Sequence, residues 1–473
     1  MLCGKGTFGQ VHYKDGFATK TAPLFRENIV DSNLREAIFY SYLSPPTSNL
    51  TSALLQPPPP ASIARCADVS LDLQYTFHFK LPYYGVPIHK YKLSRAQLIE
   101  CMQQLLQGLE WLHARGWSHG DLKPSNVLVQ ANPIKCTLID FGSIHFGGDR
   151  VRLCHQRCTI YYVSPEELMR LEASSASDMW SFGAMLYELL TGHTFILQFM
   201  QFMQVSNERI EQFRHACVHA DNKDTFNPKA FLCAFFKHDV MYSHILAFLQ
   251  QRIKDRAYQS VLGHCFLLDS TQRITARKLL SSGCFACAAA IPVALNVMDV
   301  IETYRQTISP IREEYMESRL KIVTTLLKLC KDDKHLGEEV FFHALTLFDR
   351  YSIRPLGHKN SSLQHALALI FCAYISGMIL RGTYVSCQSL LQHIVEPDIN
   401  PLIVQLKFVQ FLRAFGFRLY NSSPDLLYAM KCIAKKETPK FTDQQGMMTA
   451  QTALQYLWHH DHIVEISEQI FER

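Results

Sequence analysis

Two short motifs and the spacing between them constrain this chain more than any other feature of its sequence. The first is the run His119–Asn126 (HGDLKPSN), and the second is Asp140–Gly142 (DFG), which begins fourteen residues after Asn126. Each lies beside a short apolar, strand-like segment. Phosphoryl transfer needs a carboxylate that accepts or orients the proton of the nucleophile, and oxygen atoms that hold metal ions. Asp121 suits the first task, and Asn126 together with Asp140 suits the second.

Upstream of these motifs lie the parts of a phosphate-binding site. The run Gly4–Val11 (GKGTFGQV) fits G-x-G-x-x-G-x-V, in which three glycines let backbone amides approach phosphate oxygens. These glycines are Gly4, Gly6 and Gly9. Lys20 closes a strand-like segment, and Glu36 lies on a following helix. Each alone would be read as a solvated surface charge. In this order, we expect an ion pair that positions the lysine on the α- and β-phosphates.

Two further motifs complete the series, SPE at Ser164–Glu166 and D-x-W-S-F-G at Asp178–Gly183. With them, residues 1–290 resemble a eukaryotic protein kinase domain, and the D-L-K-P-x-N form resembles serine/threonine kinases more than tyrosine kinases. The resemblance implies a bilobal α+β fold, with a strand-rich N-lobe over residues 1–84 and a helical C-lobe over residues 85–290. It also implies ATP and Mg²⁺ as cofactors, and a protein Ser or Thr hydroxyl as acceptor of the γ-phosphate.

The resemblance assigns further roles by position. Lys123 would steady the γ-phosphate during transfer, acting beside Asp121. Glu166 would pair with Arg273 in a structural role. The adenine pocket would comprise Val11, Ala18 and Leu128, and the hinge between the lobes would comprise Leu81, Tyr83 and Tyr84.

Several positions depart from the family pattern. Gly120 replaces the arginine that usually receives a phosphate from the activation segment, and Cys154 stands where related kinases carry the phosphorylated threonine. We therefore predict activity without phosphorylation of this segment. Val163 replaces an arginine of cyclin-dependent kinases, which leaves a preference for proline after the target residue open. Because the glycine run begins at Gly4, we expect the strand that normally precedes it to be almost absent.

A second pattern follows the predicted linker, residues 291–311. Residues 312–424 contain successive amphipathic helices. Their five predicted ranges are Leu320–Cys330, Glu338–Tyr351, Leu363–Ile379, Ser386–Ile394 and Leu402–Phe415. Five helices at this spacing resemble a cyclin box, in which Arg319 and Asp349 would form a buried pair. An all-α bundle without cyclin function explains the periodicity equally well. Residues 425–473 are expected to form a helical tail.

The helix around Glu36 resembles the PSTAIRE helix of cyclin-dependent kinases, although only Arg35 and Glu36 match in full. If the cyclin resemblance holds, this domain would be an intramolecular partner that presses Glu36 toward Lys20 in cis. Two alternatives stay open. In one, the chain is a pseudokinase or scaffold whose helical domain recruits another protein. In the other, the helical domain activates a different kinase in trans.

Composition bears on nucleic-acid binding, membrane association and cellular location. The net charge is +5, and no dense run of Lys and Arg indicates direct nucleic-acid binding. No uninterrupted apolar run reaches the about eighteen residues that span a membrane, so we expect no membrane partner. Fifteen cysteines without a recognisable secretion signal predict reduced thiols and a cytoplasmic or nuclear location. The proline run at residues 57–60 predicts an exposed loop, with docking of an SH3- or WW-type partner as the alternative.

Overall fold

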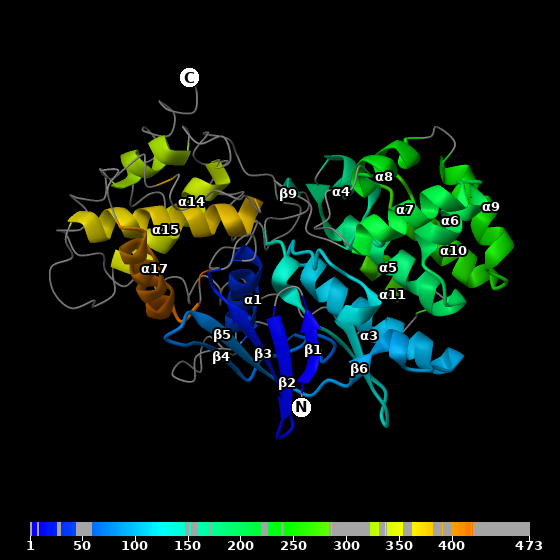
Figure 1. The fold of residues 1–473 in the computed structure, drawn as a ribbon, viewed down its shortest axis with the longest axis horizontal. Helices are drawn as coiled ribbons and strands as arrows, with labels where there is room; N and C mark the ends of the chain where they lie inside the picture. The colour runs from blue at the N-terminus through cyan, green and yellow to red at the C-terminus, as the bar shows by residue number, and fades with distance from the viewer. Residues whose placement is uncertain are drawn as a thin grey trace.

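The computed structural model describes the chain in separate segments. They are residues 2–6, 9–25, 30–43, 59–146, 151–152, 159–170, 172–218, 226–237, 241–282, 285, 322–330, 336, 338–352, 362–381, 390, 400–417 and 419. Figure 1 shows a blue sheet at the lower centre, green helices on the right and yellow to orange helices on the left. The predicted linker (291–311), the predicted tail (425–473) and Cys154 lie outside the described residues.

A five-stranded antiparallel sheet forms the first lobe, in the order β1-β2-β3-β5-β4. The strands are β1 (Leu2–Gly6), β2 (Gly9–Lys14), β3 (Phe17–Pro23), β4 (Asp68–Leu71) and β5 (Thr76–Pro82). The predicted hairpin between β2 and β3 is confirmed, since Asp15 and Gly16 have φ angles of +52° and +80°. Only Leu2 and Cys3 of β1 precede the glycine run, so the strand before the run is almost absent, as expected. The run itself supplies the rest of β1, which pairs with β2 from Leu2 opposite His12 to Gly6 opposite Gly9.

Helix α1 (Val30–Leu43) packs against this sheet, and its sequence shows only a weak amphipathic pattern. Every side chain from Ser32 to Ser41 is buried, including those of Asn33, Arg35 and Glu36. A surface helix shows one apolar face and one polar face, whereas a helix apolar on all sides lies in a core. α1 is buried on all sides yet carries polar groups. Glu36 is paired with Lys20, whereas Nε and Nη2 of Arg35 have no hydrogen-bond partner among the described residues.

The second lobe combines a small sheet with many helices. The sheet contains β6 (Val86–Pro87), β7 (Val127–Gln130) and β8 (Lys135–Leu138). The helices are α3 (Arg95–His113), α4 (Pro165–Arg170), α5 (Ser175–Thr191), α6 (Phe195–Phe202), α7 (Asn207–Val218), α8 (Pro228–Phe236), α9 (Met241–Arg252), α10 (Arg256–Cys265) and α11 (Ala276–Leu280). The short elements are η1 (Ile88–Lys90), η2 (Pro124–Asn126), η3 (Phe141–Ser143), β9 (Val151–Arg152) and β10 (Glu172–Ala173).

Local sequence signals account for the ends of the two central helices of this lobe. α3 begins after Ser94, whose side chain accepts from the backbone of Gln97, while the Gln97 side chain accepts from the backbone of Ser94. α5 begins after Ser174 and ends at Gly192, which has a φ of +75°. The middle of α5 is buried continuously, so it forms the centre of the helical lobe.

The C-terminal helices agree with the sequence prediction where the structure describes them. They are residues 322–330, α14 (Glu338–Ser352), α15 (Ser362–Arg381) and α17 (Pro401–Phe415). Of the predicted helix Ser386–Ile394, only Leu390 is described, and it is helical. Arg319 and the side chain of Asp349 lie outside the description, so their pairing stays a prediction.

One stretch of helix among the described residues, Leu363–Leu380 within α15, is long and apolar enough to cross a membrane. The sequence showed no uninterrupted run of this length because Gln364, His365 and Ser376 break it. Inside the folded protein 72% of the window is buried. α15 packs against α14 and α17, so its apolar surface is used as the core of the helical group.

Two contacts join the C-terminal helices to the turn between β4 and β5. Arg413 of α17 donates from Nη2 to the backbone oxygens of Leu71 (3.1 Å) and Asp72 (3.0 Å). The ring of Phe417, just beyond α17, meets the ring of Phe77 edge-on at 5.4 Å between centroids. Figure 1 shows α17 descending toward β4 and β5. The helical group therefore rests on the first lobe, on the side where α1 lies.

Candidate active site

The predicted lysine–glutamate pair is formed, and a second carboxylate joins it. Lys20 Nζ on β3 lies 2.6 Å from Glu36 Oε2 on α1 and 3.0 Å from Asp140 Oδ1. β3 pairs with β2 on one side and β5 on the other, so the position of Lys20 is fixed by the sheet. Lys20 and Glu36 can pair only when α1 is packed against the sheet. The presence of the pair therefore indicates that α1 lies close to the sheet.

Burial and charge act in opposite directions on these three groups. Burial raises the pKa of Glu36 to about 7, although Lys20 opposes the shift. Burial alone would lower the pKa of Lys20, but the carboxylates of Asp140 and Glu36 outweigh it and hold that pKa above its usual value. Burial would raise the pKa of Asp140, yet the charge of Lys20 lowers it overall. Lys20 and Asp140 are therefore charged at neutral pH, whereas Glu36 titrates close to it.

Phe141 and Gly142 lie directly beneath α1. The ring of Phe141 stacks on that of Phe39 of α1 at 4.0 Å between centroids. A Cβ added to Gly142 would lie 2.2 Å from Ser32 Oγ of α1, so a larger residue here would require the Ser32 hydroxyl to move. Asp140 itself has a φ of +64°, a left-handed backbone that is uncommon for residues other than glycine and is found at functional sites. The packing turns the Asp140 side chain toward Lys20.

Asp121 lies at the centre of a second cluster. Its Oδ2 accepts from Lys123 Nζ at 2.6 Å, and its Oδ1 accepts from the backbone N–H and the hydroxyl of Thr159 at 2.9 and 2.8 Å. Lys123 Nζ also donates to Thr159 Oγ1 at 2.7 Å. The amide nitrogen of Asn126 donates to the backbone oxygen of Asp121 at 2.8 Å. Sequence reasoning gave roles to Asp121 and Lys123 separately and missed the contact of Thr159 with Asp121, because a threonine 38 residues away leaves no local signal.

The backbone around Asp121 is held from below by Asp178 of α5. Asp178 accepts from the N–H groups of His119 (2.8 Å) and Gly120 (3.0 Å), and it is paired with His113 Nε2 at 2.9 Å. Burial would raise the pKa of Asp178, but these bonds, the one from His113 first, lower it overall. His113 was not singled out in the sequence, since a histidine at the end of an amphipathic helix resembles many others. Asp178 therefore supports the backbone of the catalytic loop, the run His119–Asn126.

The residues predicted to hold adenine lie around the junction of the lobes. Ala18 of β3 is opposite Leu81 of β5, and Val11 is opposite Lys20. Tyr83 was predicted to belong to the hinge, and its N–H donates to Gly16 O at 3.1 Å. This N–H therefore already has an acceptor. The side-chain hydroxyl of Tyr84 is likewise engaged, since it bonds to the backbone of Arg65.

The oxygen atoms near Lys20 and Asp121 fit a hard divalent cation. Such cations prefer carboxylate and amide oxygens, and Asp140 supplies a carboxylate. The side-chain nitrogen of Asn126 is engaged with Asp121, so its amide oxygen is the atom it can offer. Among the described residues no group of three or more His, Cys, Asp and Glu side chains could hold a metal ion by itself. The donor set therefore suits Mg²⁺ shared with phosphate oxygens.

Outside this centre, the predicted pair of Glu166 and Arg273 is confirmed. Arg273 Nη1 lies 2.5 Å from Glu166 Oε1, and Nη2 lies 2.9 Å from Glu166 Oε2. The pair is buried and bidentate, as expected for a structural link between the segment after the catalytic loop and the end of the helical lobe.

The β-sheet N-lobe, the helical C-lobe and the clustered side chains between them are similar to those of a protein kinase domain. The family model described as the protein kinase domain matches residues 78–285. This stretch includes the catalytic-loop and DFG motifs and lies within the 1–290 region for which the sequence predicted a kinase fold.

Individual relatives agree with this class. Mitogen-activated protein kinase 12 of Danio rerio is 28% identical over 226 residues, or 46% of this chain and 59% of that protein. The probable CTD kinase subunit alpha homolog of Encephalitozoon cuniculi is 24% identical over 225 residues, or 46% of this chain and 62% of that protein. A calcium and calcium/calmodulin-dependent serine/threonine-protein kinase of Oryza sativa subsp. japonica is 45% identical over 95 residues, or 19% of this chain and 18% of that protein. The chain thus spans about three-fifths of the length of the first two proteins. None of these matches addresses the cyclin resemblance.

Proposed function

We propose that this chain is an active serine/threonine protein kinase that transfers the γ-phosphate of Mg-ATP to protein Ser or Thr hydroxyls. The observation that carries the proposal is the assembled cluster of Lys20, Glu36 and Asp140, with Phe141 packed beneath α1. An active kinase needs the lysine–glutamate pair and the metal-binding aspartate in place together. A protein that used this fold only as a scaffold would not need that arrangement.

Each residue then has a separable task. Lys20, held by Glu36, would bind the α- and β-phosphates, and Asp140 with Asn126 would hold Mg²⁺, which neutralises charge on the phosphates when bound. Asp121 would accept and orient the proton of the acceptor hydroxyl. Lys123, 2.6 Å from Asp121, lies where it can neutralise the transferred phosphoryl group. Thr159 would fix the Asp121 carboxylate, since it donates two hydrogen bonds to one oxygen.

The test is transfer of labelled γ-phosphate from Mg-ATP to a general basic protein, comparing the full chain with Asp121→Asn. We expect transfer to fall by at least about a hundredfold in the variant, the scale typical for loss of a positioned acid or base. Transfer by neither protein, despite measurable ATP binding, would contradict the proposal. It would favour the alternative of a pseudokinase or scaffold.

The C-terminal helices are proposed to form a cyclin-like domain that activates the kinase domain in cis. Support comes from the bonds of Arg413 to Leu71 and Asp72, and from the packing of Phe417 on Phe77. β4 and β5 belong to the same sheet against which α1 packs, so support on this side favours the inward position of Glu36. Because both domains share one chain, the effective concentration of the activator would be far above that of a free partner.

A double variant tests this arrangement without cutting the chain. Arg413→Ala with Phe417→Ala removes both contacts, and we expect kcat to fall while ATP binding persists. Lys328→Ala is the matched control, since Lys328 is an exposed charge elsewhere in the helical group. Kinase activity equal in the double variant and the control would refute activation in cis. Co-purification of a second kinase that is active only together with this chain would instead favour activation in trans.

Activity without phosphorylation of the activation segment is also proposed. Gly120 offers no guanidinium to a phosphate, and Asp121 is already held by Lys123 and Thr159. Mass-spectrometric mapping of the active protein decides the point. An obligatory phosphate within residues 143–160 would overturn the proposal.

A further inference from the structure

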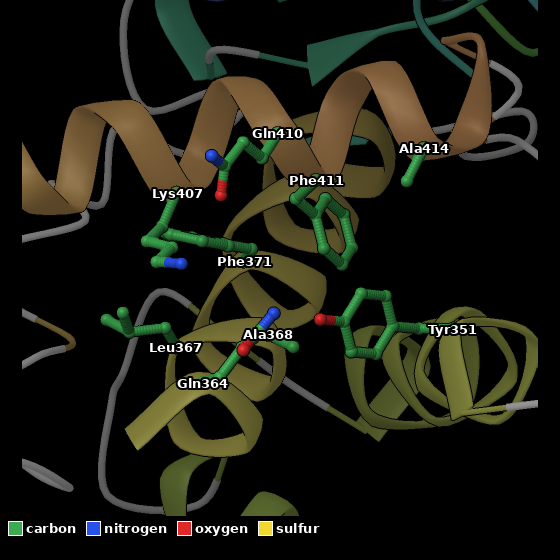
Figure 2. A pocket seen from close by; sticks show the side chains of 9 residues that line it. All are labelled: Tyr351, Gln364, Leu367, Ala368, Phe371, Lys407, Gln410, Phe411 and Ala414. Atoms are coloured by element: carbon green, nitrogen blue, oxygen red, sulfur yellow. The ribbon is translucent and has the colours of Figure 1, made fainter. Parts of the chain in front are cut away.

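Outside the kinase domain, the proposed function leaves unused a cavity of about 270 Å³ among α14, α15 and α17. Figure 2 shows side chains from all three helices surrounding it. Its interior is apolar, formed by Leu367 and Phe371 of α15 and Phe411 of α17, and its rim carries Gln364, Lys407 and Gln410. Ligand pockets commonly combine an apolar interior with a few polar groups in this way.

Exposed apolar side chains continue from the rim along α17. Leu402, Ile403 and Leu406 have relative exposures of 70%, 46% and 45%, and Leu363 at the start of α15 has 39%. Four of the eight large hydrophobic residues that are exposed in the described part of the chain lie here. Ile403 and Lys407 are one helical turn apart, so the exposed surface of α17 leads into the cavity. Isolated apolar residues are ordinary on a surface, whereas such a group beside a cavity marks an interaction site.

The charge that lines the cavity is positive. Lys407 is the only charged side chain that lines the cavity, and no salt bridge among the described residues involves it. The sequences of α15 and α17 contain no Asp or Glu, whereas that of α14 contains Glu338, Glu339 and Asp349, none of which is among the described side chains that line the cavity. An occupant with carboxylates next to an apolar side chain would therefore match the surface, and one with lysine or arginine at that place would be repelled.

We propose that this surface binds a short acidic segment of a partner protein through one large apolar side chain, such as Leu or Phe, inserted into the cavity. A carboxylate beside that side chain would pair with Lys407, and further apolar side chains of the segment would cover Leu402, Ile403 and Leu406. The site is separate from the residues that contact the N-lobe, because Arg413 and Phe417 are used there. The proposal stands independently of the kinase reaction.

Fluorescence anisotropy on the full chain tests the proposal with defined probes. The probe is the fluorescein-labelled peptide Gly-Ser-Glu-Glu-Phe-Leu-Glu-Glu-Ser-Gly. Two matched peptides carry either Lys in place of every Glu, or Ala in place of Phe and Leu. We expect saturable binding of the first peptide alone. Binding should also weaken with added salt, as exposed charge pairs do.

Two variants separate the role of charge from that of the cavity. Lys407→Glu should weaken binding of the acidic peptide by about tenfold and strengthen binding of the basic one, because an attraction becomes a repulsion. Lys328→Glu makes the same change of net charge away from the cavity and should alter neither. Ala414→Phe, which fills the cavity without changing charge, should abolish binding of the acidic peptide.

Three results would overturn the proposal. The first is the absence of saturable binding of the acidic peptide to the full chain, as expected if residues 420–473 or a second copy of the chain occupy the surface. The second is equal binding of the acidic and basic peptides. The third is an equal effect of Lys407→Glu and Lys328→Glu. Because binding is read directly, none of these results depends on whether the chain transfers phosphate.

Discussion

Replacing Gly120 with alanine should destabilise the protein, because the added Cβ atom has no space. The φ of Gly120 is +78°, and a Cβ added there would lie 2.4 Å from the backbone oxygen of Ser143 and 3.1 Å from Nε2 of His145. Gly192 offers a matched comparison, because its φ is +75° and nothing lies within 4 Å of its added Cβ. Substituting alanine at both positions therefore separates the strain of a left-handed backbone from the clash.

The expected magnitudes follow from these two terms. A side chain in the left-handed region costs roughly 1–2 kcal/mol, so Gly192→Ala should lower the free energy of unfolding by that amount. Gly120→Ala carries the same cost together with overpacking against a backbone atom, roughly 1–3 kcal/mol more. The total for Gly120→Ala is then about 2–5 kcal/mol. It should also lower kcat, because relief of the clash moves the backbone beside Asp121.

Urea unfolding, followed by circular dichroism for the wild-type protein and both variants, measures these differences. The slope of the transition should stay constant if only stability changes. Equal loss of stability in Gly120→Ala and Gly192→Ala would refute the reasoning, since it would mean that Ser143 does not limit the space at position 120. Full kinase activity in a destabilised Gly120→Ala would refute the link to Asp121.

Three further predictions concern titration and a buried pair. The pKa of Glu36 is about 7 because burial disfavours its carboxylate; kcat/KM should therefore fall as the pH drops through 7 and the pair with Lys20 is lost, and a flat pH–rate profile there would contradict this. Burial lowers the pKa of His145 from 6.5 to about 4, so the unfolded chain binds the proton first. The free energy of unfolding should therefore fall by up to about 3 kcal/mol between about pH 6.5 and 4. In His145→Asn, chemical denaturation should show a smaller change of the free energy of unfolding with pH. Glu166→Gln leaves Arg273 buried without its counter-charge and should cost about 3–5 kcal/mol of stability in thermal or urea unfolding.

The agreement between sequence and structure is closest where the signal is local or periodic. The strand–turn–strand around Asp15 and Gly16, and the ranges of α14, α15 and α17, follow from turn chemistry and amphipathic spacing. The strand β1 was missed because the glycine run that forms it was read only as a loop. Glycine is intrinsically poor in strands, and pairing with β2 overrode that preference.

The sequence by itself predicted which residues of this chain would carry chemistry. The order of Lys20, Glu36, Asp121, Asn126 and Asp140 was sufficient for that prediction, because phosphoryl transfer demands those residue types.

Only the tertiary structure decided how the chemistry is held. Thr159 on Asp121, Ser32 against Gly142, and Arg413 on Leu71 join residues that are far apart in the chain, the last pair by 342 positions. Such contacts depend on how whole elements pack, and a single side chain carries no periodic or local mark of its distant partner. The cavity beside Lys407 arises in the same way, since side chains of three separate helices line it.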